Sequence, residues 1–254
     1  MRVYSADGLI LRTYRYGEAD RIVVFLTEDR GKKRGVAKNA TKSRRRFGAA
    51  LEPLTRGRVA YVEREHRELV RLDRIEPTAM LLGRDSAQLA DGAAVLGHAA
   101  YFAELLDEWS PDGMANERLF RLGAAVGGAL GHVSSVSSLA RYFEYWLLRL
   151  EGVYPAIDAC PRCGRRVLSA GAVLVLADRA YVCRECAHGG PKLSADAMQF
   201  LHAAATRTPT DVGGVSLAAG PRRELAHAHD RLIATHLEKE LRSTRIVKEL
   251  GPDS

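Results

Sequence analysis

The stretch RIVVFLTEDRGKKRGVAKNATKSRRR, residues 21–46, combines a strand, a turn and a long basic run. Residues 21–27 are β-branched and aromatic, which predicts a strand, and residues 28–31 carry a turn signal. The chain is then expected to pair back as another strand at residues 33–37. Nine of the residues from 30 to 46 are Lys or Arg, and none is Asp or Glu. The stretch therefore predicts two paired strands that lead into a basic loop.

The basic run is better explained as part of a folded loop than as a disordered tail. Gly35, Val36 and Ala37 give it turn and strand character, and Phe47 and the apolar segment 49–54 follow it at once. A tail would lie at a terminus and would lack both features. We expect this loop to present its cations to a polyanion.

The neighbouring segments predict further short strands. They are residues 3–13 with a turn at Asp7-Gly8, residues 57–63, and residues 68–75 after a hairpin connection at 64–67. About five strands without an intervening helix must hide their edges, which favours a small closed or partly open β-barrel. We therefore predict a five-stranded OB-fold at residues 1–80, although an SH3-like barrel would give a similar pattern.

The excess positive charge lies entirely in this predicted domain. The 254 residues include 38 Lys or Arg and 31 Asp or Glu, a formal net charge of +7. Residues 1–80 hold 19 basic and 11 acidic residues (+8), and residues 81–254 hold 19 and 20 (−1). This asymmetry favours nucleic acid as a partner. A membrane surface is disfavoured, because the basic run lacks the large apolar residues of an amphipathic helix.

No segment predicts export or membrane insertion. Residues 1–4 lead into polar residues without an apolar core, and no window approaches the roughly 18 apolar residues that a membrane helix needs. We expect a cytoplasmic, nucleoid-associated protein, in which disulfides are rare.

From about residue 81 the hydrophobic period changes from 2 to 3.6, which predicts a helical domain at residues 81–254. The expected helices are 86–109, 115–130, a third that ends at Gly152, 191–206 and 221–249, with a surface loop at 207–220. The first is expected to bury Leu89, Ala93, Leu96, Ala100, Ala103 and Leu106. The third is expected to be capped by Ser137 or Ser138 and to place an aromatic stripe from Leu139 to Leu150 in the core.

The cysteines form two C-x2-C pairs, Cys160 with Cys163 and Cys183 with Cys186. Two residues between thiolates let both reach one metal from a tight turn, and Gly164 accommodates the backbone beyond the second ligand. Four thiolates complete a tetrahedron without an open position, so we predict a structural zinc module at about residues 156–190. A redox dithiol is disfavoured because no βαβ frame is present, whereas the spacing alone leaves an iron–sulfur cluster open.

No catalytic group is indicated by the sequence. It contains no Walker-type G-x-x-x-x-G-K-[ST] motif and no paired-carboxylate pattern of a metal-dependent nuclease. His188 is expected to be a bystander beside the cysteines, and His227, His229 and His236 to be partly buried structural residues. We favour a non-enzymatic binding protein. The alternative is a metal-dependent nucleic-acid-processing enzyme with dispersed carboxylates.

From about residue 8 onward, the chain resembles the bacterial RecO family of recombination mediators. The segments that carry the resemblance are LILRTYRYGEADRIVVFLT (9–27), GVAKNATKSRRRFGAALEPL (35–54), ELVRLDRIEP (68–77), FEYWLLRLEGVYP (143–155), CPRCG (160–164), CREC (183–186) and ELRSTRIVKEL (240–250). The resemblance implies an N-terminal OB-fold, a helical C-terminal domain and an inserted zinc module. It implies zinc ligation by the four cysteines.

The resemblance also implies a function. Such proteins bind single- and double-stranded DNA, anneal complementary strands and contact the acidic C-terminal tail of single-stranded-DNA-binding protein. With RecR, and in some bacteria RecF, they help to load RecA onto coated strands. The positions that match the family's DNA-binding region are Lys32, Lys33, Arg34, Lys38, Lys42, Arg44, Arg45 and Arg46. The residues themselves suggest Tyr14 and Tyr16, beside Arg12, for base stacking, with barrel-surface or core tyrosines as the equal alternative.

Overall fold

The computed structural model describes residues 1–43, 45–81, 92–237, 241 and 243. The chain divides into two compact units, Met1–Gly131 with Leu241–Ser254, and His132–Glu240. The expected domains, 1–80 and 81–254, divide the chain at a different residue, and this division stays a prediction. Within the described residues, no helix has the length and apolar character needed to cross a membrane.

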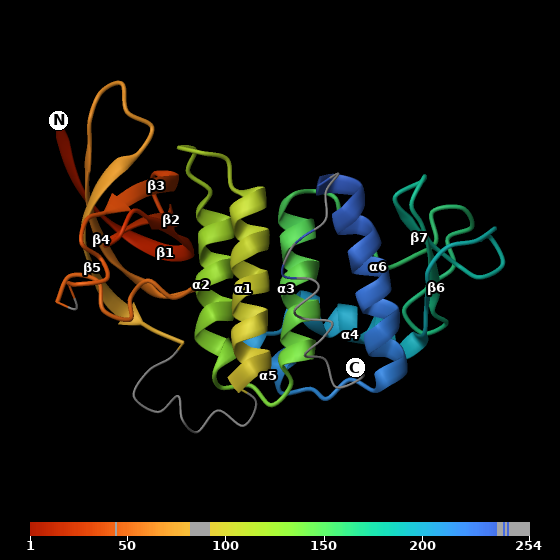
Figure 1. Ribbon diagram of the computed structural model, residues 1–254. Helices are drawn as coiled ribbons and strands as arrows, with labels where there is room; N and C mark the ends of the chain where they lie inside the picture. Colours follow the sequence, from red (N-terminus) through yellow and green to blue (C-terminus); the bar gives the residue numbers. More distant parts are fainter. Residues whose placement is uncertain (44, 82–91, 238–240, 242, 244–254) are drawn as a thin grey trace. The chain divides into compact units, whose positions relative to one another are not determined.

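Five strands of the first unit form a closed barrel in the order β1-β2-β3-β5-β4 (Figure 1). They are β1 (Arg2–Tyr16), β2 (Asp20–Thr27), β3 (Gly31–Ala37), β4 (Arg56–Glu63) and β5 (Val70–Ala79). Neighbouring strands are antiparallel except β3 and β5, whose parallel pairing closes the barrel. Closure pairs the edges that an open sheet would expose. The predicted five-stranded OB-type barrel is confirmed.

The turn expected at Asp7-Gly8 is wrong. β1 runs through both residues, with β2 and β4 paired to it on either side. A Cβ atom on Gly8 would lie only 2.6 Å from Cγ2 of Val59, which belongs to β4. Gly8 therefore allows two strands to approach closely, and this explains a glycine without a turn.

Residues 38–55, which connect β3 to β4 and which we call the basic loop, close the barrel interior. The core there consists of Ala6, Ile10, Val23, Phe25, Ala37, Ala40, Phe47, Ala50, Val59, Tyr61, Val70, Leu72 and Ile75. Ala40, Phe47 and Ala50 come from the basic loop, and Phe47 is only 2% exposed. Burial of these side chains fixes the loop against the barrel. The basic run is thus folded, as predicted.

Two helices of the first unit, α1 (Gly92–Trp109) and α2 (Glu117–Leu130), lie side by side next to the barrel (Figure 1). The buried face expected for α1 is wrong in part, because Ala93 and Leu96 are exposed. Leu89 lies outside the described residues. Tyr101, Phe102 and Trp109 are buried instead. These aromatic side chains bury more area than the alanines and set the orientation of the helix.

The second unit contains the remaining helices and a small sheet. The helices are α3 (Val136–Leu150), α4 (Ala195–Thr206), α5 (Pro209–Gly213) and α6 (Ala219–Leu237), and the sheet consists of β6 (Ala172–Val175), β7 (Ala180–Val182) and β8 (Lys192–Leu193). The predicted stripe on α3 is largely core, with Leu139, Phe143 and Leu147 fully buried. α6 accounts for the expected last helix as far as the chain is described.

Two expectations about helix ends in the second unit are wrong. The cap of α3 is Ser135, whose Oγ accepts a hydrogen bond from the Ser138 backbone N–H at 3.3 Å. The segment 207–220 is not only a loop, because it contains α5. Thr208 and Asp211 form a capping box there, and this motif starts a helix that periodicity over five residues cannot reveal.

Five side chains form a buried polar network in the second unit. The Tyr154 hydroxyl lies 3.1 Å from the Tyr181 hydroxyl on β7 and 2.8 Å from Nε2 of His229 on α6. Nδ1 of His229 lies 2.7 Å from one carboxylate oxygen of Glu144 on α3, and Arg141 donates to the other at 2.7 Å. The network connects the sheet to α3 and α6 through polar side chains that supply one another's hydrogen bonds inside the protein.

We expect the second unit to lose stability as the pH falls below about 6.5, the ordinary pKa of histidine. Burial lowers the pKa of His229, and this is partly offset by the hydrogen bond of its Nδ1 to the Glu144 carboxylate. The unfolded chain therefore takes up the proton more readily, so this contribution is complete above pH 6.5 and declines toward the lowered pKa. Urea unfolding between pH 5 and pH 7.5 measures the effect. His229→Gln should show a flatter pH dependence than the wild type, and identical slopes would contradict the assignment.

Candidate nucleic-acid interface and metal centre

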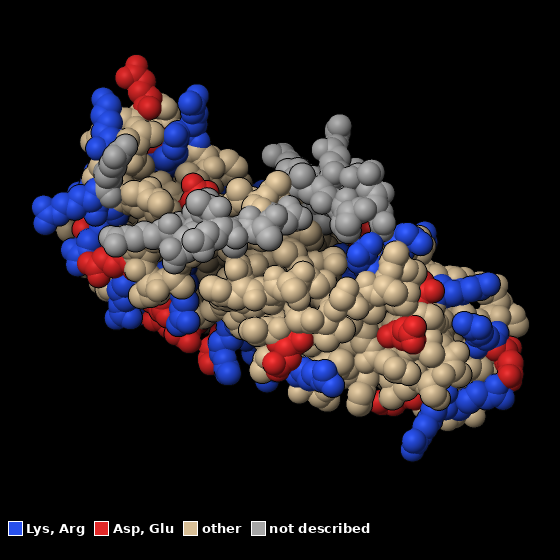
Figure 2. Space-filling model, turned by 90° about the horizontal axis from the view of Figure 1, so that it is seen from below, with Lys and Arg blue, Asp and Glu red and all other residues tan. Residues whose placement is uncertain are grey.

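The basic loop presents three exposed cations, Lys38, Lys42 and Arg45. Within the described part of the chain, no carboxylate lies within ion-pair distance of any of them. Arg44, predicted to bind DNA with them, lies outside the described residues. Figure 2 shows Lys and Arg side chains projecting from the barrel. Cations without acidic partners are free to neutralise phosphates.

Arg46 holds the basic loop together. Its Nη2 donates to the backbone oxygen of Lys38 at 2.7 Å, and its Nε donates to Oγ of Ser43 at 3.0 Å. The guanidinium also lies over the Phe47 ring, 5.0 Å from the ring centroid. These contacts give Arg46 a structural role, and its DNA contact stays a prediction.

Lys32 and Arg12 lie in an ion-pair cluster beside α1. Lys32 is 7% exposed, and its Nζ lies 3.0 Å from a carboxylate oxygen of Asp107 and donates to the Asp107 backbone oxygen at 2.6 Å. Arg12 pairs with Glu104 at 2.8 Å and with Asp107 at 3.3 Å. Lys32 is buried, and the partly exposed Arg12 is paired with two carboxylates, so we leave both residues out of the interface that we propose, and their DNA contacts stay predictions.

Two further strand cations have surface partners. Lys33 pairs with Glu63 at 2.8 Å, and Arg34, whose side chain is 52% exposed, lies 3.8 Å from Asp112. The pair of Arg34 is exposed and therefore weak, about 0–1 kcal/mol, whereas Lys33 and Glu63 are partly buried, with side chains 21% and 30% exposed. A DNA contact by Lys33 or Arg34 stays a prediction.

Tyr14 and Tyr16 are exposed at 43% and 49% but do not share a face with Arg21. The register of β1 and β2 pairs Tyr14 with Ile22, Tyr16 with Asp20, and Arg15 with Arg21. Side chains alternate between the two faces of a strand. The two tyrosines therefore lie on the face opposite to Arg15 and Arg21, and their stacking role stays a prediction.

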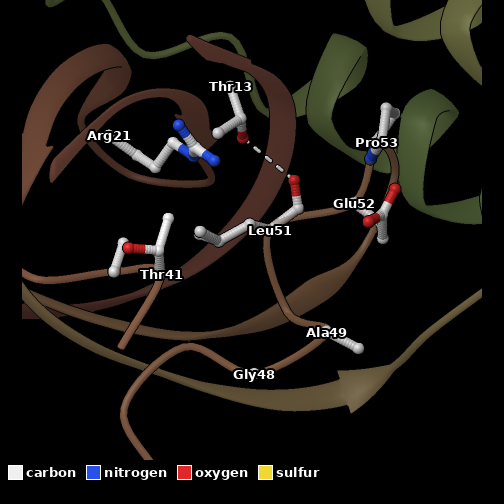
Figure 3. A pocket seen from close by; sticks show the side chains of 9 residues that line it. Thr13, Arg21, Thr41, Gly48, Ala49, Leu51, Glu52 and Pro53 are labelled. Carbon is white, nitrogen blue, oxygen red and sulfur yellow. Dashed lines mark hydrogen bonds between the residues drawn. The ribbon is translucent and has the colours of Figure 1, made fainter. Parts of the chain in front are cut away.

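A pocket of about 600 Å³ lies between the basic loop and the hairpin of β1 and β2. Figure 3 shows Arg21 and Thr13 at one side, Leu51 in the middle, and Glu52 with Pro53 at the other side. None of these residues was predicted from the sequence as a site residue. A signal was present, because a hairpin turning at residues 17–19 places Arg15 opposite Arg21.

The four cysteines converge on one point, as predicted. Their Sγ atoms all lie within 4.8 Å of one another, and those of Cys163 and Cys183 are 3.6 Å apart. Zn–S bonds of about 2.3 Å in a tetrahedron place sulfurs about 3.8 Å apart, so the donor set fits one metal ion. Gly164, with φ of +74°, follows the second ligand as expected. His188 is exposed and is not part of the cluster.

Backbone groups and two arginines hold the cysteine turns in place. The Gly164 N–H donates to the Cys160 oxygen at 2.8 Å, and Arg162 donates to the Cys186 oxygen at 2.5 Å, which joins the two turns. Arg165 pairs with Glu185. Burial raises the pKa of the Cys160 thiol, but hydrogen bonds from backbone N–H groups outweigh it and lower this pKa to about 6. The thiolate that a metal needs is thus favoured at Cys160, whereas hydrogen bonds with Cys183 and Cys163 raise the pKa of Cys186 to about 12.

Comparison with known proteins covers both units. The family model "Recombination protein O N terminal" matches residues 1–81, and "Recombination protein O C terminal" matches residues 93–245. The chain belongs to the RecO family. The matched ranges contain the barrel with its basic loop and the four-cysteine cluster, so the resemblance seen in the sequence is confirmed.

Several curated RecO-family relatives are similar over most of their length. The DNA repair protein RecO of Anaeromyxobacter dehalogenans is 34% identical over 248 residues, 96% of each chain. The protein of that name from Geobacter sulfurreducens is 34% identical over 260 residues, 99% of this chain and 100% of the relative. The one from Koribacter versatilis is 42% identical over 163 residues, 64% of each chain.

Proposed function

We propose that the chain is a non-enzymatic, DNA-binding recombination mediator in DNA repair. It binds single- and double-stranded DNA and anneals complementary strands. With RecR, and with RecF where that protein takes part, it promotes loading of RecA onto strands coated by single-stranded-DNA-binding protein, whose acidic tail it contacts. We place this activity in the cytoplasm, at the nucleoid. Membership in the RecO family and the names of its relatives support the proposal.

The observation that carries DNA binding is the set of free cations on a folded loop. Lys38, Lys42 and Arg45 are exposed, and the packing of Phe47 and the hydrogen bonds of Arg46 hold their backbone in place. Cations on a folded loop gain phosphate contacts without first ordering a flexible tail. Such contacts do not read base identity, which suits a protein that anneals strands of any sequence.

The salt dependence of DNA binding tests the role of the basic loop. Changing Lys38, Lys42 and Arg45 together to Ala should flatten the plot of log K against log salt for single strands by about 2 units, at about 0.7 per lost phosphate contact. Fluorescence anisotropy with an oligonucleotide measures the slope. The matched control changes Lys192, Arg207 and Arg231 to Ala, which removes the same charge from exposed positions of the second unit. Equal slopes for both variants would rule out the basic loop as the contact.

A strand-annealing assay tests whether the protein is a non-enzymatic mediator or a nucleic-acid-processing enzyme. Two complementary labelled oligonucleotides are mixed with the protein, with and without magnesium, and the products are separated by size. Annealing without cleavage in both conditions is the expected result. Cleavage products that require magnesium would overturn the non-enzymatic proposal and support the nucleic-acid-processing enzyme.

We propose that the four cysteines hold a structural Zn²⁺. Four thiolates leave no open coordination position for a substrate. The compact arrangement of the sulfurs supports a single ion, because the several iron atoms of an iron–sulfur cluster hold their thiolates farther apart. Metal analysis of the purified protein should give one zinc and no iron per chain.

A further inference from the structure

The pocket beside the basic loop has walls that are held in place on both sides. On one side, Oγ1 of Thr13 donates to the Leu51 oxygen at 2.9 Å. On the other, the backbone N–H of Thr41 donates to the Ala19 oxygen at 3.2 Å, and the N–H of Asn39 donates to a carboxylate oxygen of Asp20 at 2.8 Å. The loop is thus fastened both to β1 and to the turn of the hairpin. A pocket formed before binding costs little to order around a ligand.

The charges of the pocket favour an anion at one side. Arg21 lines the pocket, and Arg15 lies directly opposite it on β1. Like charges in this position repel each other. Among the described residues, no carboxylate lies within ion-pair distance of either guanidinium. An anion between the two arginines would relieve the repulsion.

The rest of the pocket suits a flat, largely apolar group. Leu51, Ala49 and Pro53 supply apolar surface, and Thr41 adds a hydroxyl. Glu52 lies on the far side of Leu51 from Arg21 (Figure 3). Its carboxylate repels phosphate, so an anionic group is directed toward Arg21. The volume of about 600 Å³ lies in the range of small-ligand sites and is large enough for a nucleotide.

We propose that this pocket holds one nucleotide of a DNA single strand, with its phosphate at Arg21 and its base against Leu51 and Ala49. The inference rests on the proposed DNA-binding function and adds a base-binding subsite to the basic loop. A base that is paired in a duplex cannot enter, because it must first leave the stack. The pocket therefore distinguishes single strands from duplexes, while the loop cations bind both.

Two variants of the full-length protein separate the contribution of the base contact to binding from that of the phosphate contact. Ala49→Trp fills the pocket from an exposed position and leaves the charge unchanged, so it should weaken binding of an oligo(dT) strand about tenfold without changing the salt slope. It should leave duplex affinity unaltered. Arg21→Met should flatten the salt slope for the single strand by about 0.7. The matched control is Arg71→Met, which removes an exposed arginine of β5 outside the pocket.

Binding is measured by fluorescence anisotropy, and thermal unfolding shows that each variant is folded. If Ala49→Trp weakens single strands and duplexes equally, or if Arg21→Met behaves like Arg71→Met, the nucleotide pocket is refuted. In that case, binding that still depends on Lys38, Lys42 and Arg45 leaves the proposed function standing. A wild-type protein that binds no oligonucleotide overturns both proposals. Displacement of the strand by micromolar dTMP would identify a free-nucleotide site and also overturn the inference.

Discussion

Replacing Cys160 with serine is expected to remove the bound metal and to lower the thermal unfolding midpoint of the unit His132–Glu240 by about 10 °C or more. Structural zinc contributes about 10–16 kcal/mol of binding free energy in zinc-finger peptides, and this energy is coupled to folding. The strands around the cluster are only four, three and two residues long. So short a sheet cannot keep its fold without the metal.

The loss should spread to the helices through the buried polar network. Tyr181 lies two residues before the ligand Cys183, and its hydroxyl lies 3.1 Å from that of Tyr154, which in turn contacts His229. When the sheet unfolds, these buried polar groups lose partners, which costs about 1–3 kcal/mol for each unsatisfied group. We therefore expect a single lowered transition for the unit.

Metal content and unfolding are measured on the same samples. The control is His188→Ala, an exposed position near the cysteines, which should keep one metal ion and the wild-type midpoint. Single-strand affinity, corrected for the folded fraction, should stay unchanged in Cys160→Ser. A folded, metal-free protein with weakened DNA binding would show that the cluster contributes to binding, and an unchanged midpoint would refute the structural role.

The parts of the fold that were predicted correctly depend on local pattern. The cysteine spacing and the β-branched run of β2 act over a few residues, and the structure contains both. Two errors, the turn at Asp7-Gly8 and the buried face of α1, arose where tertiary packing decides, whereas the Ser135 cap and the capping box of α5 are local motifs that were missed. Gly8 has the appearance of a turn residue, but close approach of Val59 requires it within a strand.

The candidate site, too, could be predicted from the sequence only in part. Local composition indicated the basic loop, and Lys38, Lys42 and Arg45 are exposed there. No local pattern separates these cations from Lys32, whose partner Asp107 is 75 residues away. The pocket depends on contacts between β1 and residue 51, 38 positions apart, so the sequence could indicate the opposed Arg15 and Arg21 but not the pocket itself.

Lys32 is expected to matter for stability and not for DNA binding. Lys32→Met should destabilise the first unit by about 3 kcal/mol, the lower end of the cost of breaking a buried ion pair. The change leaves Asp107 buried at 8% exposure with Arg12, 3.3 Å away, as its remaining partner. Urea unfolding measures the loss, and oligonucleotide affinity per folded molecule should remain at the wild-type value.

The neighbouring residue provides the control. Lys33→Met removes the same charge from the same strand, but its pair with Glu63 is more exposed, with side chains 21% and 30% exposed against 8% and 11% for Lys32 and Asp107, so the loss should stay below about 1 kcal/mol. Two positions that the sequence presents as equivalent are thus expected to differ at least threefold in their effect on unfolding. If Lys32→Met instead leaves stability intact and flattens the salt slope for single strands, Lys32 contacts phosphate, and the ion-pair cluster beside α1 opens when DNA binds.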